Sequence, residues 1–356
     1  MGFSINLADA QQLFTKKLTA VLSDRVEPKA FLRSHFTETE SWSLEISTQT
    51  SRVAELIAKD TTRGTDGNRN IFGKSTEKLF IPPFYNEYFD ITQLDGYNQL
   101  YGDPSALISD IVFDRFLQTV ADKMMLIQDS IDRAYEKQCG DVFTDGIITL
   151  ADGSQIDFKR KSESKVTLSG AALWTNAAAD PNDVLLQAAN FLRITGKSPD
   201  ATYNVIMGAD VYQAYIANAA VLKRGAIFNW NMDRLLPAQR QSTGFSDHGT
   251  VSAGSYNFNL LSYPQYFDSY SGSSLTKGTP YIDPKKIIVV PQVCKNVLAY
   301  AAVPQLLSTG ATPMKGKWFV YNWPDQKMTT HDFGVKSAGV AIPVAVDQIF
   351  TAKVLA

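Results

Sequence analysis

The hydrophobic pattern of the chain is dominated by one long stretch of helical spacing between Asp103 and Gly140. Asp103 can cap a helix, and Pro104 suits the first helical position, where no N–H donor is needed. Gly140 is a natural helix end because glycine enters the left-handed conformation at little cost. We therefore predict a single helix over residues 104–139, about 54 Å long. Its apolar residues, spaced alternately by four and three, are Phe113, Leu117, Val120, Met124, Ile127, Ile131 and Ala134.

The charged residues of this helix fall mainly outside the apolar stripe. Asp129, Asp132 and Arg133 are examples, and Glu136 follows them. The simplest interpretation of the acidic residues is a solvated helix face.

The segment before the helix contains a long polar stretch between two extended ones. Trp42 to Ile46 alternates like a strand, and residues 78–85 include Pro82 and Pro83, which cannot donate hydrogen bonds to a sheet. Between them, residues 59–70 are rich in Gly, Asn and Thr. This pattern predicts a long hairpin that projects from the body, since so long a loop in a compact domain is unusual unless it is functional or contacts a partner.

The first residues leave two interpretations open. Residues 1–25 are amphipathic, and Phe31 to Glu40 is polar and irregular. A projecting arm and a simple terminal helix both fit this composition.

After the long helix the chain alternates between short strands and helices. We expect a hairpin at Gly146–Phe158, a strand at 166–168, a helix from Asp180-Pro181 to about Thr195, a strand at 202–207 and a helix at 209–220. Further strands are expected at 250–263, 286–290, 297–303, 318–323, 329–338 and 348–355, with a polar surface loop at 269–278. This order predicts an α+β fold.

Composition narrows the function classes. The chain has 356 residues, 44% of them hydrophobic, and a net charge of −2, which gives no global reason to bind nucleic acid or an anionic membrane. Only Cys139 and Cys294 are present, so no disulfide framework is implied and a reducing compartment is expected. No run of 18 apolar residues occurs, which argues against a membrane span.

The nearest match to a nucleotide-binding motif runs from Gly67 to Ser75. It has five residues between its glycines where a phosphate-binding loop has four, and an extended, proline-rich stretch follows it instead of a helix. We interpret it as a flexible loop tip.

Cysteine catalysis requires a thiolate beside a base. Cys139 or Cys294 near His35, His248 or His331 would provide one, so a cysteine hydrolase stays as an alternative. Buried free cysteines are more often small hydrophobes, and the sequence shows no histidine pair or Cys-x-x-Cys with metal-ligand spacing. We therefore expect no catalytic residue, no cofactor and no metal.

The order of the segments resembles the lambda-type major capsid protein family (capsid protein E) of tailed bacteriophages. No single motif is diagnostic, and the likeness covers most of the chain from about residue 28, being weakest at 225–278. The segments that carry it are Lys78-Leu-Phe-Ile-Pro-Pro83 with the long helix after it, the hairpin 146–158, Leu168-Ser-Gly170, Trp174, Asp180-Pro-Asn-Asp183, Tyr203 to Tyr212, Asp325 to Thr330, Ser337 to Ile342 and the last strand.

The resemblance implies a fold similar to the Hong Kong 97 phage capsid protein. On this chain it implies an N-terminal arm (1–46), an extended loop (47–90), a peripheral domain (91–170 and 293–337) built on the long spine helix, and an axial domain (171–292 and 338–356). The tip and limbs of the extended loop would contact another subunit. The implied contact residues are Arg63, Gly64, Gly67, Arg69, Gly73, Lys74, Phe80, Pro82 and Pro83.

The resemblance also implies a function without an active site. Family members form hexamers and pentamers of an icosahedral head that encloses double-stranded DNA. The expected partners are other copies of the chain, a portal, a scaffold, a decoration protein and, non-specifically, the packaged DNA, with no membrane. The protein would reside in the virion and be assembled in the host cytoplasm. Another virion structural or binding protein is the alternative.

Overall fold

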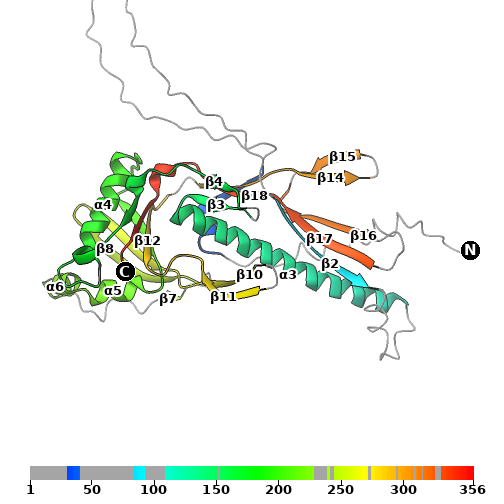
Figure 1. Ribbon diagram of the computed structural model, residues 1–356, viewed down its shortest axis with the longest axis horizontal. Coiled ribbons are helices and arrows are strands. Elements are labelled where there is room, and N and C mark those ends of the chain that lie inside the picture. The colour runs from blue at the N-terminus through cyan, green and yellow to red at the C-terminus, as the bar shows by residue number, and fades with distance from the viewer. Residues whose placement is uncertain are drawn as a thin grey trace, which may run out of the picture.

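The computed structural model describes residues 30–40, 84–92, 109–150, 153–227, 239–240, 244–271, 274–293, 296–307, 310–314, 316–324 and 330–356. Its longest element is helix α3, Ser109–Thr144. Figure 1 shows α3 running from a large sheet with helices at one end of the molecule to smaller sheets at the other. The helix thus connects the two halves of the subunit.

The end of α3 differs from the sequence prediction. The helix continues through Gly140 to Thr144, so the predicted end was wrong, while the predicted start at Asp103-Pro104 lies outside the described residues. Gly140 is required for close packing, since a Cβ atom there would lie 2.6 Å from the backbone oxygen of Tyr281. The left-handed glycine is instead Gly146, with φ of 68°.

The buried face of α3 follows the predicted stripe only in part. Val120, Met124 and Ile131 are buried as predicted, whereas Ile127 and Ala134 are only partly buried. Beyond Ile131 the apolar face continues through Tyr135, Cys139, Val142 and Phe143.

The large sheet has seven strands in the order β5-β19-β12-β6-β9-β8-β7. The pairs β6–β9 and β19–β5 are parallel, and the other pairs are antiparallel. The strands are β5 Lys165–Thr167, β19 Phe350–Lys353, β12 Lys286–Pro291, β6 Thr202–Met207, β9 Tyr256–Ser262, β8 Ser246–Ala253 and β7 Gln239–Arg240. Helices α4 (Pro181–Ile194), α5 (Val211–Ala217) and α6 (Ala219–Ile227) accompany this sheet.

Both faces of the large sheet are buried because side chains alternate along each strand. On β6, Val205 belongs to the cluster that contains α4, whereas Ile206 belongs to the cluster that contains α3. On β12, Ile287 and Ile288 divide in the same way. The sheet therefore separates two hydrophobic cores and fixes α3 relative to α4.

Two three-stranded sheets and three hairpins form the rest of the described fold. One sheet has the order β1-β13-β18 and the other the order β16-β17-β2. The strands are β1 Phe36–Glu40, β13 Asn296–Tyr300, β18 Gly339–Pro343, β16 Phe319–Pro324, β17 Thr330–Ser337 and β2 Tyr85–Thr92. The hairpins are β3–β4 (Ile147–Thr149, Gln155–Asp157), β10–β11 (Tyr266–Ser271, Ser274–Pro280) and β14–β15 (Val303–Leu307, Gly310–Met314). Short 3-10 helices lie at Arg33–His35, Ser162–Ser164, Gly170–Ala172 and Val346–Gln348.

Several local predictions are confirmed. The 146–158 hairpin forms, Asp180 caps α4 by accepting a hydrogen bond from the Asn182 amide (3.1 Å), and β6 has the predicted bounds.

Three others were wrong. The 209–220 helix breaks at Asn218, whose side chain accepts a hydrogen bond from the Ala220 amide and starts α6. Residues 269–271 and 274–278 belong to strands β10 and β11 instead of a loop, and Phe31 to Glu40 contains strand β1.

The packing at Gly140 generates a prediction. In Gly140→Ala the added methyl group meets the Tyr281 carbonyl, so we expect a net loss of about 1–2 kcal/mol in the free energy of unfolding, although alanine favours a helix by about 1 kcal/mol. Urea unfolding of the unassembled subunit measures it. Ser130→Ala, at an exposed position of the same helix, is the control and should be neutral or stabilising. A Gly140→Ala variant as stable as that control would contradict the close-packing account.

Candidate assembly surface

The C-terminal end of α3 is held by one buried arginine. The last carbonyls of a helix have no partners within the helix. One terminal nitrogen of Arg160 donates to the Phe143 and Thr144 carbonyls, at 2.9 and 3.0 Å. The other donates to the Ile349 carbonyl and the Thr351 hydroxyl, both at 3.0 Å. Arg160 thereby joins α3 to β19 of the large sheet.

No carboxylate forms an ion pair with Arg160 within the described part of the chain. Its charge is stabilised by the carbonyl dipoles and by the negative charge of nearby Asp145. Burial lowers the pKa of Arg160 to about 10, which leaves the guanidinium charged at neutral pH. Gly146 lies against the Arg160 side chain, where a Cβ atom would collide with it. Gly146 therefore allows the left-handed backbone that ends the helix and leaves room for the Arg160 side chain.

A second polar contact fixes the segment 30–40 to the middle of α3. The Glu136 carboxylate accepts hydrogen bonds from the Leu32 and Arg33 amides, at 2.8 and 2.9 Å, and from the Tyr263 hydroxyl at 2.8 Å. Asp132, one helical turn earlier, pairs with the Arg33 guanidinium at 2.6 Å. We call these five residues the polar clamp.

The clamp overturns the interpretation of the α3 acids as a solvated face. Asp132 and Glu136 are each 2% exposed. Burial raises the pKa of Glu136, and the hydrogen bonds from Leu32, Tyr263 and Arg33 oppose this effect. The sequence contains one usable signal: Gln128, Asp132 and Glu136 recur every four residues beside the apolar stripe, and all three are buried.

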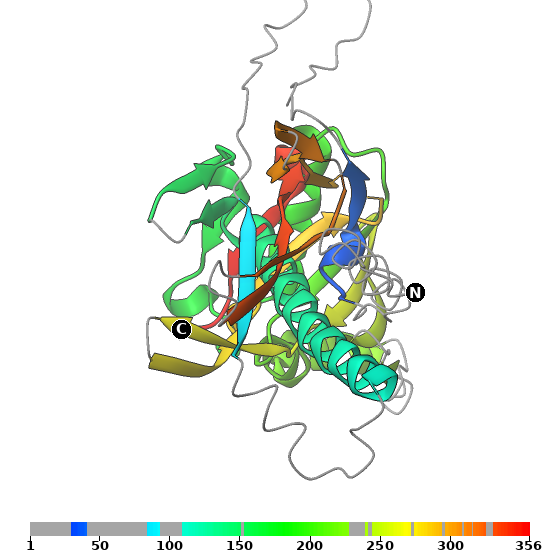
Figure 2. The same cartoon turned by 90° about the vertical axis from the view of Figure 1, so that its right-hand side faces the viewer.

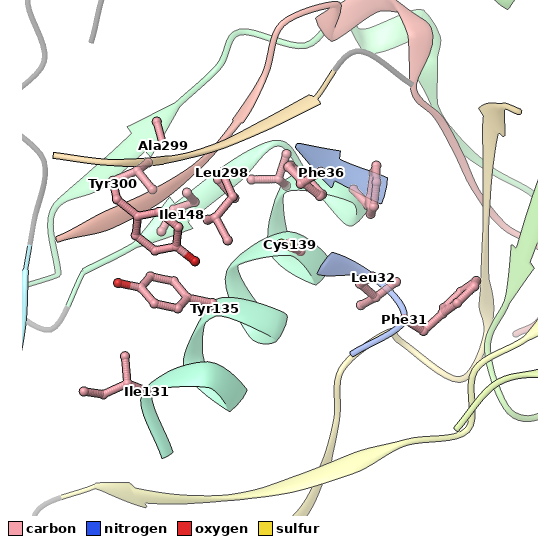
Figure 3. Close-up of a cluster of buried hydrophobic side chains, with 14 of the residues drawn as sticks. Phe31, Leu32, Phe36, Ile131, Tyr135, Cys139, Ile148, Leu298, Ala299 and Tyr300 are labelled. Carbon is pink, nitrogen blue, oxygen red and sulfur yellow. The ribbon is translucent and has the colours of Figure 1, made fainter. Parts of the chain in front are cut away.

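Apolar packing completes the attachment of segment 30–40. Figure 3 shows Leu32 and Phe36 beside Cys139 of α3, with Leu298 and Tyr300 of β13 across from them. Strand β1 pairs with β13 in parallel. Residues 30–40 are therefore part of the body.

The β16-β17-β2 sheet has one buried and one exposed face. Phe333 and Val335 of β17 are buried in the cluster around α3, and Phe89 of β2 packs there too. On the opposite face, Tyr88 is 63% exposed and Trp323 is 66% exposed. Figure 2 views the molecule from the end at which these strands lie in Figure 1. Strand β2 is an edge strand of this sheet among the described strands, so this end offers exposed aromatic side chains and a strand edge that no other described strand covers.

The structure leaves the predicted contact residues untested. Arg63, Gly64, Gly67, Arg69, Gly73, Lys74, Phe80, Pro82 and Pro83 all lie outside the described residues. The described part of the predicted extended loop begins at Phe84 and leads into β2, which pairs with β17 along its whole length.

The cysteine alternative finds no support in the described geometry. Cys139 is fully buried in the α3 core, and burial raises the pKa of its thiol well above the ordinary value. Among the described residues it has no hydrogen-bond partner, and Cys294 lies outside them. His248 instead bonds Ser262 at 2.8 Å, and His331 stacks on Phe333. The described residues also hold no cluster of His, Cys, Asp or Glu that suits a metal ion.

Comparison with known proteins decides the family. A family model described as phage major capsid protein E matches residues 15–354. The chain belongs to this family. Among curated proteins no match is found.

The search of solved structures gives similar chains at low sequence identity. The putative capsid protein of a prophage from E. coli CFT073 has 16% sequence identity and a TM-score of 0.62, over 96% of this chain and 99% of that one. The cyanophage P-SCSP1u capsid has 9% identity and a TM-score of 0.48, over 93% and 89% of the two chains. The bacteriophage PhiM1 mature capsid has 13% identity and a TM-score of 0.46, over 93% and 88%.

Family membership confirms the predicted α+β, Hong Kong 97-like capsid fold and the role as a phage major capsid protein. The protein is a structural component of the virion and not an enzyme, so the hydrolase alternative was wrong. Among the described helices, none is long and apolar enough to span a membrane.

The Arg160 contact predicts a large stability loss in Arg160→Met. That change removes the Arg160 donor from the Thr144 and Ile349 carbonyls and leaves Phe143 with the Thr351 hydroxyl alone, so we expect a loss of about 3 kcal/mol in urea unfolding of the subunit. The control is Lys161→Met. Lys161 is about half exposed and pairs with Asp347 at 3.0 Å, and its loss should stay below about 1 kcal/mol. Equal effects of the two changes would contradict the role of Arg160.

The polar clamp predicts that the free energy of unfolding depends on pH through Glu136, and that Glu136→Gln removes this dependence. Because the folded pKa of Glu136 is raised, its contribution to stability is fully present below the unfolded pKa and is lost as the pH rises through the folded pKa. The stability advantage of the unchanged protein over the variant should therefore shrink from acid toward neutral pH. Urea unfolding at several pH values between about 4 and 7 measures it. An advantage that grows with pH would show that the amide hydrogen bonds outweigh burial.

Proposed function

We propose that copies of this capsid protein form hexamers and pentamers of an icosahedral head of a tailed phage that encloses double-stranded DNA. The observation that carries the proposal is the end of the subunit at the β16-β17-β2 sheet. There, exposed aromatic side chains and a strand edge without a partner among the described strands occur on a capsid fold. Exposed apolar surface and open edges are costly in a monomer, and a neighbouring copy can cover both.

The extended loop, residues 47–90, is proposed to make the contact between copies. Its tip and limbs leave the body before β2 and cross to the next subunit, with Arg63, Arg69, Lys74 and the Pro82-Pro83 limb among the contact residues. Head-to-tail contacts between identical subunits close into rings, which is the symmetry of a capsomer. Each contact can be weak, because many act together in a shell.

The two hydrophobic cores support the proposed division into peripheral and axial domains. The core around α3 would belong to the peripheral domain, and the core around α4 with the far face of the large sheet to the axial domain. The proposed end of the returning peripheral segment changes, because β18 pairs with β13 and belongs to the α3 core. We therefore extend the returning peripheral segment from Ser337 to Pro343.

The further partners of the proposal are a portal, a scaffold and a decoration protein, with assembly in the host cytoplasm. The net charge of −2 favours contact with the packaged DNA that is non-specific and weak.

Deleting residues 61–74 tests the role of the loop. The deleted segment contains the polar tip and none of the described core, so we expect subunits with unchanged thermal unfolding that form no shells. Sedimentation velocity and negative-stain microscopy, with any scaffold supplied, measure assembly. A Gly/Ser segment of the same length is the control that separates loop length from loop chemistry. Normal shells from the deletion variant would refute the loop's role, and an unchanged protein that stays monomeric under every condition would refute the function itself.

A further inference from the structure

The imidazole of His248 joins helix α5 to the large sheet. His248 lies on β8 and is 6% exposed. Its ring stacks on the ring of Tyr212, on α5, with the two centroids 3.5 Å apart and the two planes at 14°. Its Nε2 atom forms a 2.8 Å hydrogen bond with the hydroxyl of Ser262, on β9. One buried ring therefore contacts a helix and a neighbouring strand together.

A bulge in β8 shapes the backbone at this ring. The register of β8 against β9 shifts between Asp247 and Thr250, so that His248 and Gly249 lie opposite a single residue of β9. Gly249 has a φ of 91°, which glycine adopts at little cost. Such a bulge adds one residue to a strand and changes the direction of a side chain. The sequence His248-Gly249 thus provides both the ring and the backbone that directs it.

The position of His248 suits a neutral ring. A protonated imidazole carries two N–H donors, and Ser262 is the only hydrogen-bond partner of this ring within the described residues. A buried charge with an unsatisfied donor is costly. Protonation of His248 therefore weakens the contact between α5 and the sheet.

The groups around the ring do not compensate for the buried charge. Asp247 favours the protonated ring, but its Oδ1 atom already accepts a hydrogen bond from the Gly249 amide at 2.9 Å. Burial outweighs this acid and lowers the pKa of His248. Helix α5 contributes Tyr212, which stays neutral because burial raises its pKa. Strand β7 adds a cation to the described residues, Arg240, two strand positions away and opposite Ser246.

The other two histidines do not join elements in this way. His331 stacks on Phe333 of its own strand. His35 donates a hydrogen bond to the Phe31 carbonyl of its own segment at 3.1 Å. The His35 ring also meets Phe143 of α3 edge-on, but the polar clamp already holds that segment to α3.

We propose that His248 is an acid-sensitive latch, whose neutral ring holds the first turn of α5 on the large sheet and whose protonation loosens that turn. Above the ordinary histidine pKa of about 6.5 the ring is neutral in the folded and the unfolded chain. As the pH falls below this value the unfolded chain binds the proton more readily, so the stabilisation by the ring is lost. The latch thus acts in acid.

Hydrogen exchange of the unassembled subunit, corrected for the intrinsic exchange rate at each pH, tests the latch. Amides of α5 should exchange about fivefold faster or more at pH about 4.5 than at pH about 7.5. Amides of α4 on the same sheet are the internal control and should change less. An unchanged α5, or an equal change in α4 and α5, would overturn the proposal, since the latter means general acid unfolding.

Variants assign the effect to the His248 ring. His248→Gln stays neutral and can still bond Ser262, and His248→Phe keeps a ring beside Tyr212. In whichever of the two folds, the pH dependence of α5 exchange should disappear, whereas His35→Gln should retain it. A pH dependence that persists in the His248 variants would overturn the proposal.

A titration of the unchanged protein needs no variant. In nuclear magnetic resonance spectra, the His248 ring should titrate below the ordinary histidine value, and the Tyr212 ring signals should shift with the same midpoint. A His248 ring that titrates at or above the ordinary value, or Tyr212 signals that do not follow it, would overturn the proposal.

Discussion

The structure of the subunit depends on the hydrogen bonds that the last carbonyl groups of its longest helix accept. Arg160 donates to the Phe143 and Thr144 carbonyls at the end of α3, and the Thr351 hydroxyl adds a second donor to Phe143. The same guanidinium bonds β19, so helix and large sheet share one set of hydrogen bonds. An arginine without a carboxylate partner is suited to this place, since its planar, forked donors can serve carbonyls from two elements at once.

The polar clamp adds a second fixed point on the same helix. Through Glu136 and Asp132, the helix holds the backbone and side chain of segment 30–33. With Arg160 at its end, α3 has its orientation fixed relative to both the large sheet and the segment 30–40. A shell needs subunits of reproducible shape, because small errors of angle accumulate over many contacts. The buried polar contacts of α3 supply that reproducibility, and they involve neither the exposed sheet face nor the β2 edge.

The limits of the sequence predictions follow from the range of the interactions involved. Asp180 with Pro181 marks the start of α4 correctly because a helix cap is local. The helix end predicted at Gly140 was wrong because this glycine is required for packing against Tyr281, which is far away in the sequence. The solvated position predicted for Glu136 was wrong because its hydrogen-bond donors, Leu32, Arg33 and Tyr263, are also distant in the sequence. The pairing of Asp90 with Asp332 was equally hidden from the sequence, since it appears only when β2 and β17 are in register. The family, in contrast, was visible in the order of many short segments, and it was confirmed.

A reconstruction of assembled shells by electron cryomicroscopy is the most direct test of a rigid subunit joined to its neighbours by an extended loop. The account predicts that α3, the large sheet and segment 30–40 keep the arrangement described above in every subunit. It also predicts that residues 47–83 cross to an adjacent copy. Density that returns this loop to its own subunit, or an α3 that changes orientation relative to the large sheet, would contradict the account.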